Sequence, residues 1–174
     1  MIKLRQPAPA LAFDTLDGGR WALADQRPEQ FTMIVVYRGL HCPICRRYLT
    51  ELNGMIGEFD KRGVTTVVTS TDPEERARTA RDQWGLDKLK IGYGVPIETA
   101  REWGLYVSTG RGVTSAGIEE PSIFAEPGLF LVKPDGTLYW GSFSTMPFAR
   151  PHFNEIAQAI EFVVSKNYPA RGEA

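Results

Sequence analysis

Short apolar runs alternate with amphipathic stretches along most of this chain. Phe31 to Tyr37, Val64 to Ser70 and Gly128 to Val132 are rich in β-branched and aromatic residues, which predicts buried strands. Behind Pro43, apolar residues recur at three- and four-residue spacing, which predicts a helix with one buried face. Such alternation needs crossover connections, so the pattern predicts parallel strand pairing with helices packed on the sheet.

Turn residues divide the remaining chain into elements. Asp17-Gly18-Gly19 predicts a hairpin near the N-terminus, and Lys133 to Gly136 predicts a turn into a strand over Thr137 to Phe143. Asp72 is expected to be the N-cap of a helix that has Pro73 at its first position. That helix should run to about Trp84 and end at Gly85.

The rest of the chain adds smaller elements. Ile91 to Val95 predicts a short strand, Pro96 to Trp103 a short helix and Phe153 to Val164 a final amphipathic helix. Ser108 to Glu126 shows no period and is expected to be an irregular lid or binding loop. The order of elements predicts one domain over residues 1–174, a three-layer α/β/α sandwich with a mixed central sheet.

Composition narrows the functional classes. The 174 residues carry 20 basic and 21 acidic side chains, a net charge of −1, which argues against a nucleic-acid partner. No apolar run approaches the roughly 20 residues of a membrane span. The N-terminus lacks the apolar core of a signal peptide, and we expect a cytoplasmic protein.

The two cysteines, Cys42 and Cys45, are the strongest chemical feature. A bond between them would close a very small loop, so its purpose would be chemical rather than structural. The pair follows a predicted strand and opens a predicted helix, with Pro43 at the helix start. Free N–H groups and the helix dipole favour a thiolate there, so Cys42 is the expected attacking thiol and Cys45 the resolving thiol. Arg38 and Arg46 are expected to add positive charge.

Other readings of the pair remain open. The cysteines could be inert and buried, or part of a metal or iron–sulfur site shared with His41 and His152 or with a second chain. His41 adjoins Cys42 and would ligate the same ion only with strain. His41 has two further interpretations, a residue that tunes the thiolate and a plain polar loop residue.

The chain resembles the alkyl hydroperoxide reductase/thiol-specific antioxidant (AhpC/TSA) group of the thioredoxin superfamily, in its peroxiredoxin-like branch. The segments QPAPALAFDTLDGGRWAL, VVYRGLHCPICRRYLTEL and EPGLFLVKPDGTL carry the similarity. It implies a thioredoxin-like fold, no cofactor, and redox work through Cys42 and Cys45.

Departures from the peroxiredoxin pattern affect the expected reaction. Where that family places a proline and a hydroxyl residue before its reactive cysteine, this chain has Val35 and Gly39. Where it places an arginine before the third strand, this chain has Pro127, which resembles the cis-proline of thioredoxin-like reductases. We therefore expect a cis peptide between Glu126 and Pro127, facing the sulfurs.

The resemblance favours a thiol–disulfide oxidoreductase restored by a thiol reductant of the thioredoxin or glutathione type. Its substrate would be an oxidised protein or a small disulfide. The alternative within the same class is a peroxidase acting on hydroperoxides, for which Arg38, Arg111 or Arg150 would have to replace the missing arginine. The alternative of another class is a metal- or cluster-binding module. Met146-Pro147-Phe148 is expected at the active-site face or in the contact of a homodimer.

Overall fold

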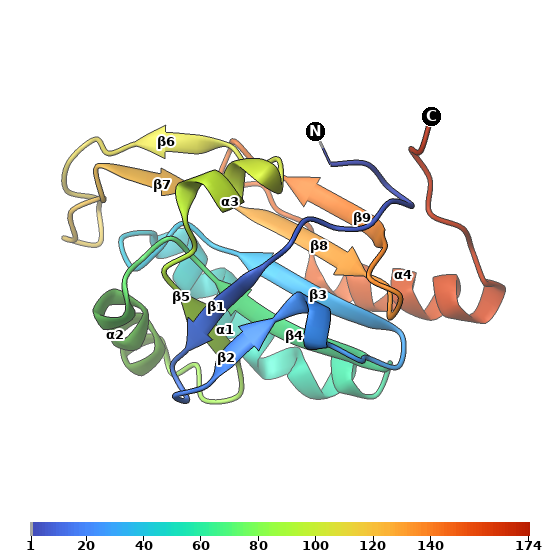
Figure 1. Cartoon of the computed structure of the whole chain (residues 1–174). Coiled ribbons are helices and arrows are strands. Elements are labelled where there is room, and N and C mark those ends of the chain that lie inside the picture. Colours follow the sequence, from blue (N-terminus) through green and yellow to red (C-terminus); the bar gives the residue numbers. More distant parts are fainter. Residues whose placement is uncertain (1) are drawn as a thin grey trace.

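A seven-stranded mixed sheet forms the centre of the protein in a computed structural model that describes residues 2–174 (Figure 1). The strand order is β2-β1-β5-β4-β3-β8-β9. The strands of this sheet are β1 (Ala12–Thr15), β2 (Arg20–Ala22), β3 (Phe31–Val36), β4 (Val64–Thr69), β5 (Lys90–Tyr93), β8 (Gly128–Val132) and β9 (Leu138–Phe143).

Strand directions confirm the mixed sheet. The β3, β4 and β5 strands run parallel, with β3 and β4 in register from Phe31 opposite Val64 to Val36 opposite Thr69. The β8 strand is antiparallel to β3 and to β9, and β1 is antiparallel to β2 and β5. The hairpins at Asp17-Gly18-Gly19 and at residues 133–136 lie where the turn residues place them.

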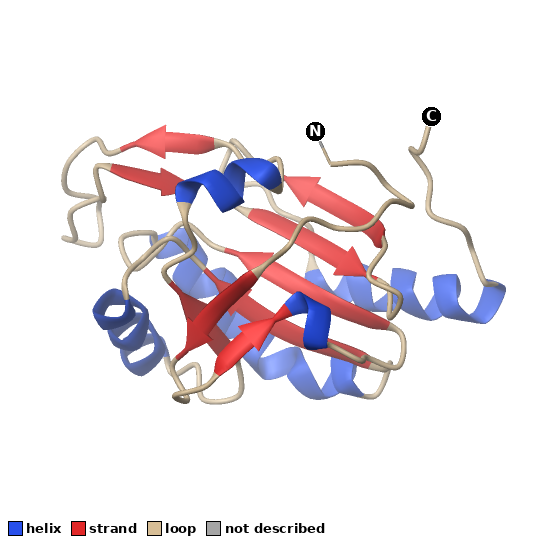
Figure 2. Cartoon of the chain, viewed as in Figure 1, coloured by secondary structure: helices blue, strands red, loops and turns tan. Residues whose placement is uncertain are grey.

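Helices cover both faces of the sheet, which gives the three layers that the sequence predicts (Figure 2). Met33 and Val35 point into the core shared with α1, α2 and α4, whereas Ile34 and Val36 point into the core on the side of α3. This alternation is the two-residue period of a strand buried on both faces. The helices are α1 (Pro43–Asp60), α2 (Glu74–Trp84), α3 (Ile97–Glu102), α4 (Phe153–Lys166) and the 3₁₀ turn η1 (Leu23–Asp25).

The residues from 108 to 126 are more ordered than the sequence suggests. The strands β6 (Val107–Thr109) and β7 (Ile123–Ala125) form a separate antiparallel hairpin. Their three-residue length is too short for any hydrophobic period to show in the sequence. The prediction of an irregular loop was therefore wrong at both ends of the segment.

The predicted cap of α2 was also wrong. The N-cap residue is Pro73, and no side chain caps this helix. The carboxylate of Asp72 instead accepts a hydrogen bond of 2.7 Å from the backbone N–H of Leu40, far along the chain. No helix in the described part of the chain is long and apolar enough to cross a membrane.

Candidate active site

A tight turn between β3 and α1 positions the cysteines. Gly39 has φ +138°, a conformation that side chains rarely adopt, and a Cβ there would lie 2.6 Å from a carboxylate oxygen of Asp72. The Asp72 carboxylate holds the neighbouring Leu40 N–H, and α1 then begins at Pro43. Cys42 is consequently the N-cap residue of α1, as its place in the sequence predicts.

Cys42 occupies a site that stabilises a thiolate. Its Sγ accepts a hydrogen bond of 3.2 Å from the backbone N–H of Cys45, in the first turn of α1. Hydrogen bonds from the Cys45 thiol and backbone, together with the positive charge of Arg150, lower the pKa of Cys42 to about 6, although burial opposes the shift. Cys42 is thus largely ionised at neutral pH.

Arg150 is the cation that reaches the sulfurs. Its Nη2 lies 3.7 Å from Sγ of Cys42 and 3.2 Å from Sγ of Cys45. The side chain is fixed by a hydrogen bond from Nε to the carbonyl of Pro147 at 2.9 Å and by the Tyr48 ring, 5.1 Å from the guanidinium. The sequence named Arg150 only as one of three candidates, because it lies 108 residues from Cys42.

Cys45 has the opposite electrostatic environment. Burial and the adjacent Cys42 raise its pKa well above that of an ordinary thiol. Both cysteines are free, and both sulfur-bearing side chains are buried, with Cys42 1% and Cys45 0% exposed. The two thiols therefore differ as an attacking thiolate and a protonated resolving thiol should differ.

His41 is buried and uncharged. Its ring packs 4.7 Å from that of Phe124, and its Nδ1 lies 3.4 Å from Nη2 of Arg76, which can only donate. Burial, then the charges of Arg38 and Arg76, lower the pKa of His41 to about 4. The histidine thus presents a neutral ring beside Cys42 and adds no positive charge to the site.

Arg38 and Arg46 do not face the sulfurs. Arg38 forms ion pairs of 3.3 Å with Glu120 and 3.2 Å with Glu126, and its guanidinium lies over the Phe124 ring. Arg46 is exposed on α1. Arg38 thereby attaches the β6–β7 hairpin and its loop to the end of β3. The hydroxyl of Thr114, in that loop, also donates a hydrogen bond of 2.8 Å to the carbonyl of His41.

The expected cis peptide at Pro127 was wrong. No cis peptide bond occurs in residues 2–174, so the Glu126–Pro127 bond is trans. The extended chain passes directly from β7 into β8 there, with the Glu126 N–H bonded to the carbonyl of Tyr106 and the Pro127 carbonyl to the N–H of Ser144. Pro127 still lies at the site, because it lines a hollow of only about 10 Å³ together with Arg150 and Tyr48.

Within the described residues, no three His, Cys, Asp or Glu side chains gather as metal ligands. His152 is the N-cap residue of α4. The geometry therefore offers no support for the metal-binding alternative in a single chain.

A thioredoxin-type α/β/α fold with a polarised dithiol at a helix N-terminus defines a thiol-dependent redox enzyme. Comparison with family models agrees, because the AhpC/TSA family model matches residues 4–140. The chain therefore belongs to the AhpC/TSA family and is an oxidoreductase that acts on peroxides or thiols. No curated protein sequence matches the chain.

Solved structures share the fold at low sequence identity. A cysteine mutant of peroxiredoxin 6 from Arenicola marina is 19% identical, with a TM-score of 0.74. The match covers 97% of this chain and 76% of the peroxiredoxin chain. Peroxidoxin BcpB from Mycobacterium tuberculosis is 15% identical with a TM-score of 0.72, covering 94% and 99%. AhpC from Enterococcus faecalis is 15% identical with a TM-score of 0.73, covering 96% and 97%.

Proposed function

We propose that the oxidant attacked by Cys42 is a hydroperoxide, the second of the two redox readings that the sequence allows. The observation that carries the proposal is the Arg150 guanidinium, which donates to both sulfurs at 3.7 and 3.2 Å. A fixed cation at this point holds the thiolate and can stabilise the negative charge that develops on the departing peroxide oxygen. Arg150 would thereby take the part of the arginine that the peroxiredoxin pattern places where this chain has Pro127.

Burial of the sulfurs supports a small oxidant. Cys42 is 1% exposed, and the hollow lined by Arg150, the residue in contact with the sulfurs, holds about 10 Å³, roughly the space of one water molecule. Hydrogen peroxide needs little more than that space, whereas an oxidised protein would first have to displace Arg150 and its loop. The Glu126–Pro127 bond is also trans, so the site lacks the cis-proline on which the resemblance to thioredoxin-like disulfide reductases rested.

The reaction balances with this chain's two cysteines, one proton from solvent and an external thiol. The Cys42 thiolate attacks the terminal peroxide oxygen, which keeps its hydrogen and becomes the S–OH of Cys42 sulfenic acid as the O–O bond breaks, and the alkoxide or hydroxide that leaves takes a proton from solvent. The Cys45 thiol then attacks the Cys42 sulfur and its proton leaves with the hydroxyl as water, which gives the Cys42–Cys45 disulfide. Two equivalents of an external thiol reduce the disulfide and are themselves oxidised.

Stopped-flow mixing of the reduced protein with hydrogen peroxide and with cumene hydroperoxide tests the proposal. We expect a second-order rate with hydrogen peroxide far above that of a free thiol, a slower reaction with the bulky cumene hydroperoxide, no reaction in Cys42→Ser, and a sulfenic acid trapped by dimedone in Cys45→Ser. A rate equal to that of a free thiol, together with rapid reduction of a protein disulfide, would instead establish the disulfide oxidoreductase reading.

We further propose that the protein works in the cytoplasm with a reductant of the thioredoxin or glutathione type. The catalytic cycle starts from two free thiols, and that compartment keeps thiols reduced. Acid quenching of cells followed by alkylation should find Cys42 and Cys45 mostly reduced before a peroxide pulse and disulfide-bonded after it. Recovery that fails without thioredoxin reductase would identify the thioredoxin route.

A further inference from the structure

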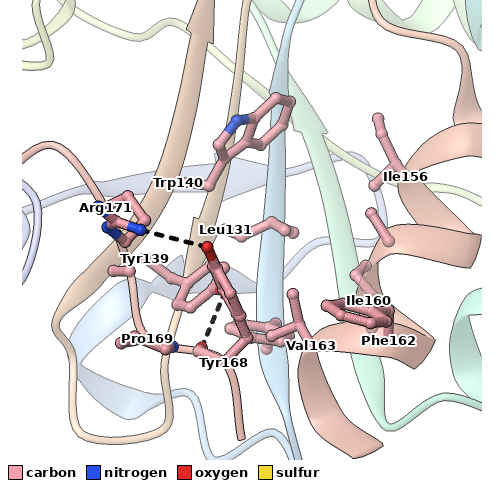
Figure 3. Close-up of a pocket in the computed structure, with 13 residues that line it drawn as sticks. Leu131, Tyr139, Trp140, Ile156, Ile160, Phe162, Val163, Tyr168, Pro169 and Arg171 are labelled. Carbon is pink, nitrogen blue, oxygen red and sulfur yellow. Dashed lines mark hydrogen bonds between the residues drawn. The ribbon is translucent and has the colours of Figure 1, made fainter. Parts of the chain in front are cut away.

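A second hollow, of about 410 Å³, lies between α4, the strands β8 and β9, and the C-terminal tail (residues 167–174) (Figure 3). Ile156, Ile160 and Val163 of α4 form one wall, and Leu131 and Trp140 of the sheet form its floor. It shares no lining residue with the hollow beside Arg150. Its volume falls in the range of small-molecule sites, about 300–1,000 Å³.

The C-terminal tail forms one side of this open hollow without filling it. Asn167 has φ +47° and turns the chain back at the end of α4. The hydroxyl of Tyr139 then donates to the carbonyl of Tyr168 at 3.1 Å, and Nε of Arg5 donates to the carbonyl of Ala170 at 2.8 Å. These polar contacts fix the tail beside the hollow, so the apolar space is formed in advance of any ligand.

One cation lies on the rim. The guanidinium of Arg171 donates to the hydroxyl of Tyr168 at 3.3 Å, and both side chains line the hollow (Figure 3). Among the described residues Arg171 forms no ion pair, and the nearby Glu173 carboxylate pairs with Arg5 at 3.2 Å. The apolar interior therefore opens next to a guanidinium that has no carboxylate partner of its own.

We propose that this hollow binds an aliphatic monocarboxylate, with its hydrocarbon chain against α4 and its carboxylate on Arg171 and Tyr168. The apolar walls favour burial of a hydrocarbon chain, and a guanidinium with an adjacent hydroxyl favours a carboxylate. A cationic amphiphile of the same length meets repulsion from Arg171. A short carboxylate such as acetate has no hydrocarbon chain to bury against the apolar walls.

Isothermal titration calorimetry of the full chain with decanoate tests the site. We expect one decanoate per chain, and no measurable binding of decylammonium or acetate. Arg171→Gln should weaken decanoate binding roughly tenfold or more, the loss of one charge-assisted hydrogen bond. Val163→Trp, which fills the hollow, should abolish it, whereas Gln158→Trp on the exposed side of α4 should leave it unchanged. The indole N–H resonance of Trp140 should shift with decanoate and serves as a local readout in each variant.

Three results would overturn the proposal. The first is a folded wild-type protein that does not bind decanoate, and the second is equal binding of decanoate and decylammonium. The third is a dimer, seen by sedimentation, that buries Trp140 and excludes decanoate, since it would assign this face to a second copy of the chain. Peroxide reduction should be unaffected by Arg171→Gln, so the outcome is independent of the reaction proposed above.

Discussion

At the scale of single residues, the proposed reaction depends on the contrast between two thiols three positions apart. Cys42 receives hydrogen bonds from the first turn of α1, and Cys45 lies fully buried behind it. Arg150 contacts both sulfurs, so one guanidinium can stabilise the thiolate before the reaction and lie beside the disulfide after it.

Replacing Arg150 tests this arrangement. In Arg150→Met we expect the peroxide rate to fall about a hundredfold, because a fixed charge-stabilising donor is lost from a buried site. The pH midpoint for alkylation of Cys42 should rise from about 6 but stay below that of a free thiol, since the hydrogen bonds from Cys45 remain. Arg46→Met removes an exposed arginine close in sequence and should change neither quantity. An unchanged midpoint in Arg150→Met would contradict the assignment.

At the scale of elements, the turn between β3 and α1 is held by a carboxylate from the following crossover. Asp72 bonds the Leu40 N–H at 2.7 Å and Nε of Arg76 at 3.1 Å, and it fills the space next to Gly39. The turn that presents Cys42 is therefore built by two parallel strand–helix units in contact.

Gly39→Ala should damage this turn. The new Cβ would lie 2.6 Å from the Asp72 carboxylate, and the backbone conformation is unfavourable for alanine. We therefore expect a loss of about 1–3 kcal/mol in the free energy of unfolding. We also expect slower reaction of Cys42 with peroxide. Gly54→Ala in α1 meets no atom within 4 Å and should raise stability by about 0.5–1 kcal/mol. Urea unfolding of both variants measures the difference, and an equal effect would exclude the proposed role of Asp72.

Glu120, in the loop of the β6–β7 hairpin, is one of the side chains that attach this segment to the active-site loop. Its carboxylate pairs with Arg38 at 3.3 Å and accepts the Arg111 N–H at 2.7 Å. In Glu120→Gln we expect faster amide hydrogen exchange over residues 107–125 and at the Cys42 loop. Glu119→Gln changes an exposed neighbouring side chain and serves as the control. Exchange confined to the hairpin itself would show that the two segments are not coupled.

At the scale of the whole molecule, the thiolate links stability to pH. The pKa of Cys42 is about 6 in the folded chain and 9.0 as an unperturbed thiol, so the unfolded chain binds more protons between these values. Stability from this group is complete above pH 9 and is lost as the pH falls through 6. The pKa difference corresponds to at most about 4 kcal/mol.

Thermal unfolding of the reduced protein should therefore show a rise in Tm from pH 6 to pH 9 relative to Cys42→Ser. The serine variant keeps the turn but has no group that titrates in this range at position 42. Parallel curves for the two proteins would mean that Cys42 is not ionised in the folded state.

Local sequence determined most of the elements and the position of the cysteine pair. The strands Phe31–Val36, Val64–Thr69 and Gly128–Val132 and the start of α1 at Pro43 follow from residue types and short spacings, which act within a few neighbours. Cys42 lies at a helix N-terminus for the same local reason. The resemblance carried by these segments correctly indicated the family.

The tertiary structure alone decided which distant groups meet that pair. Three groups that are distant in sequence contact the Cys42 loop: Arg150, Asp72 and the β6–β7 hairpin. The hydrophobic pattern of the sequence cannot predict such contacts, because it reflects only neighbouring residues. The trans bond at Pro127 and the hollow under the C-terminal tail likewise depend on how β8, β9 and α4 pack. Sequence thus determined where a thiolate forms, because that depends on one helical turn, and folding determined which arginine stabilises it, because that depends on packing between elements.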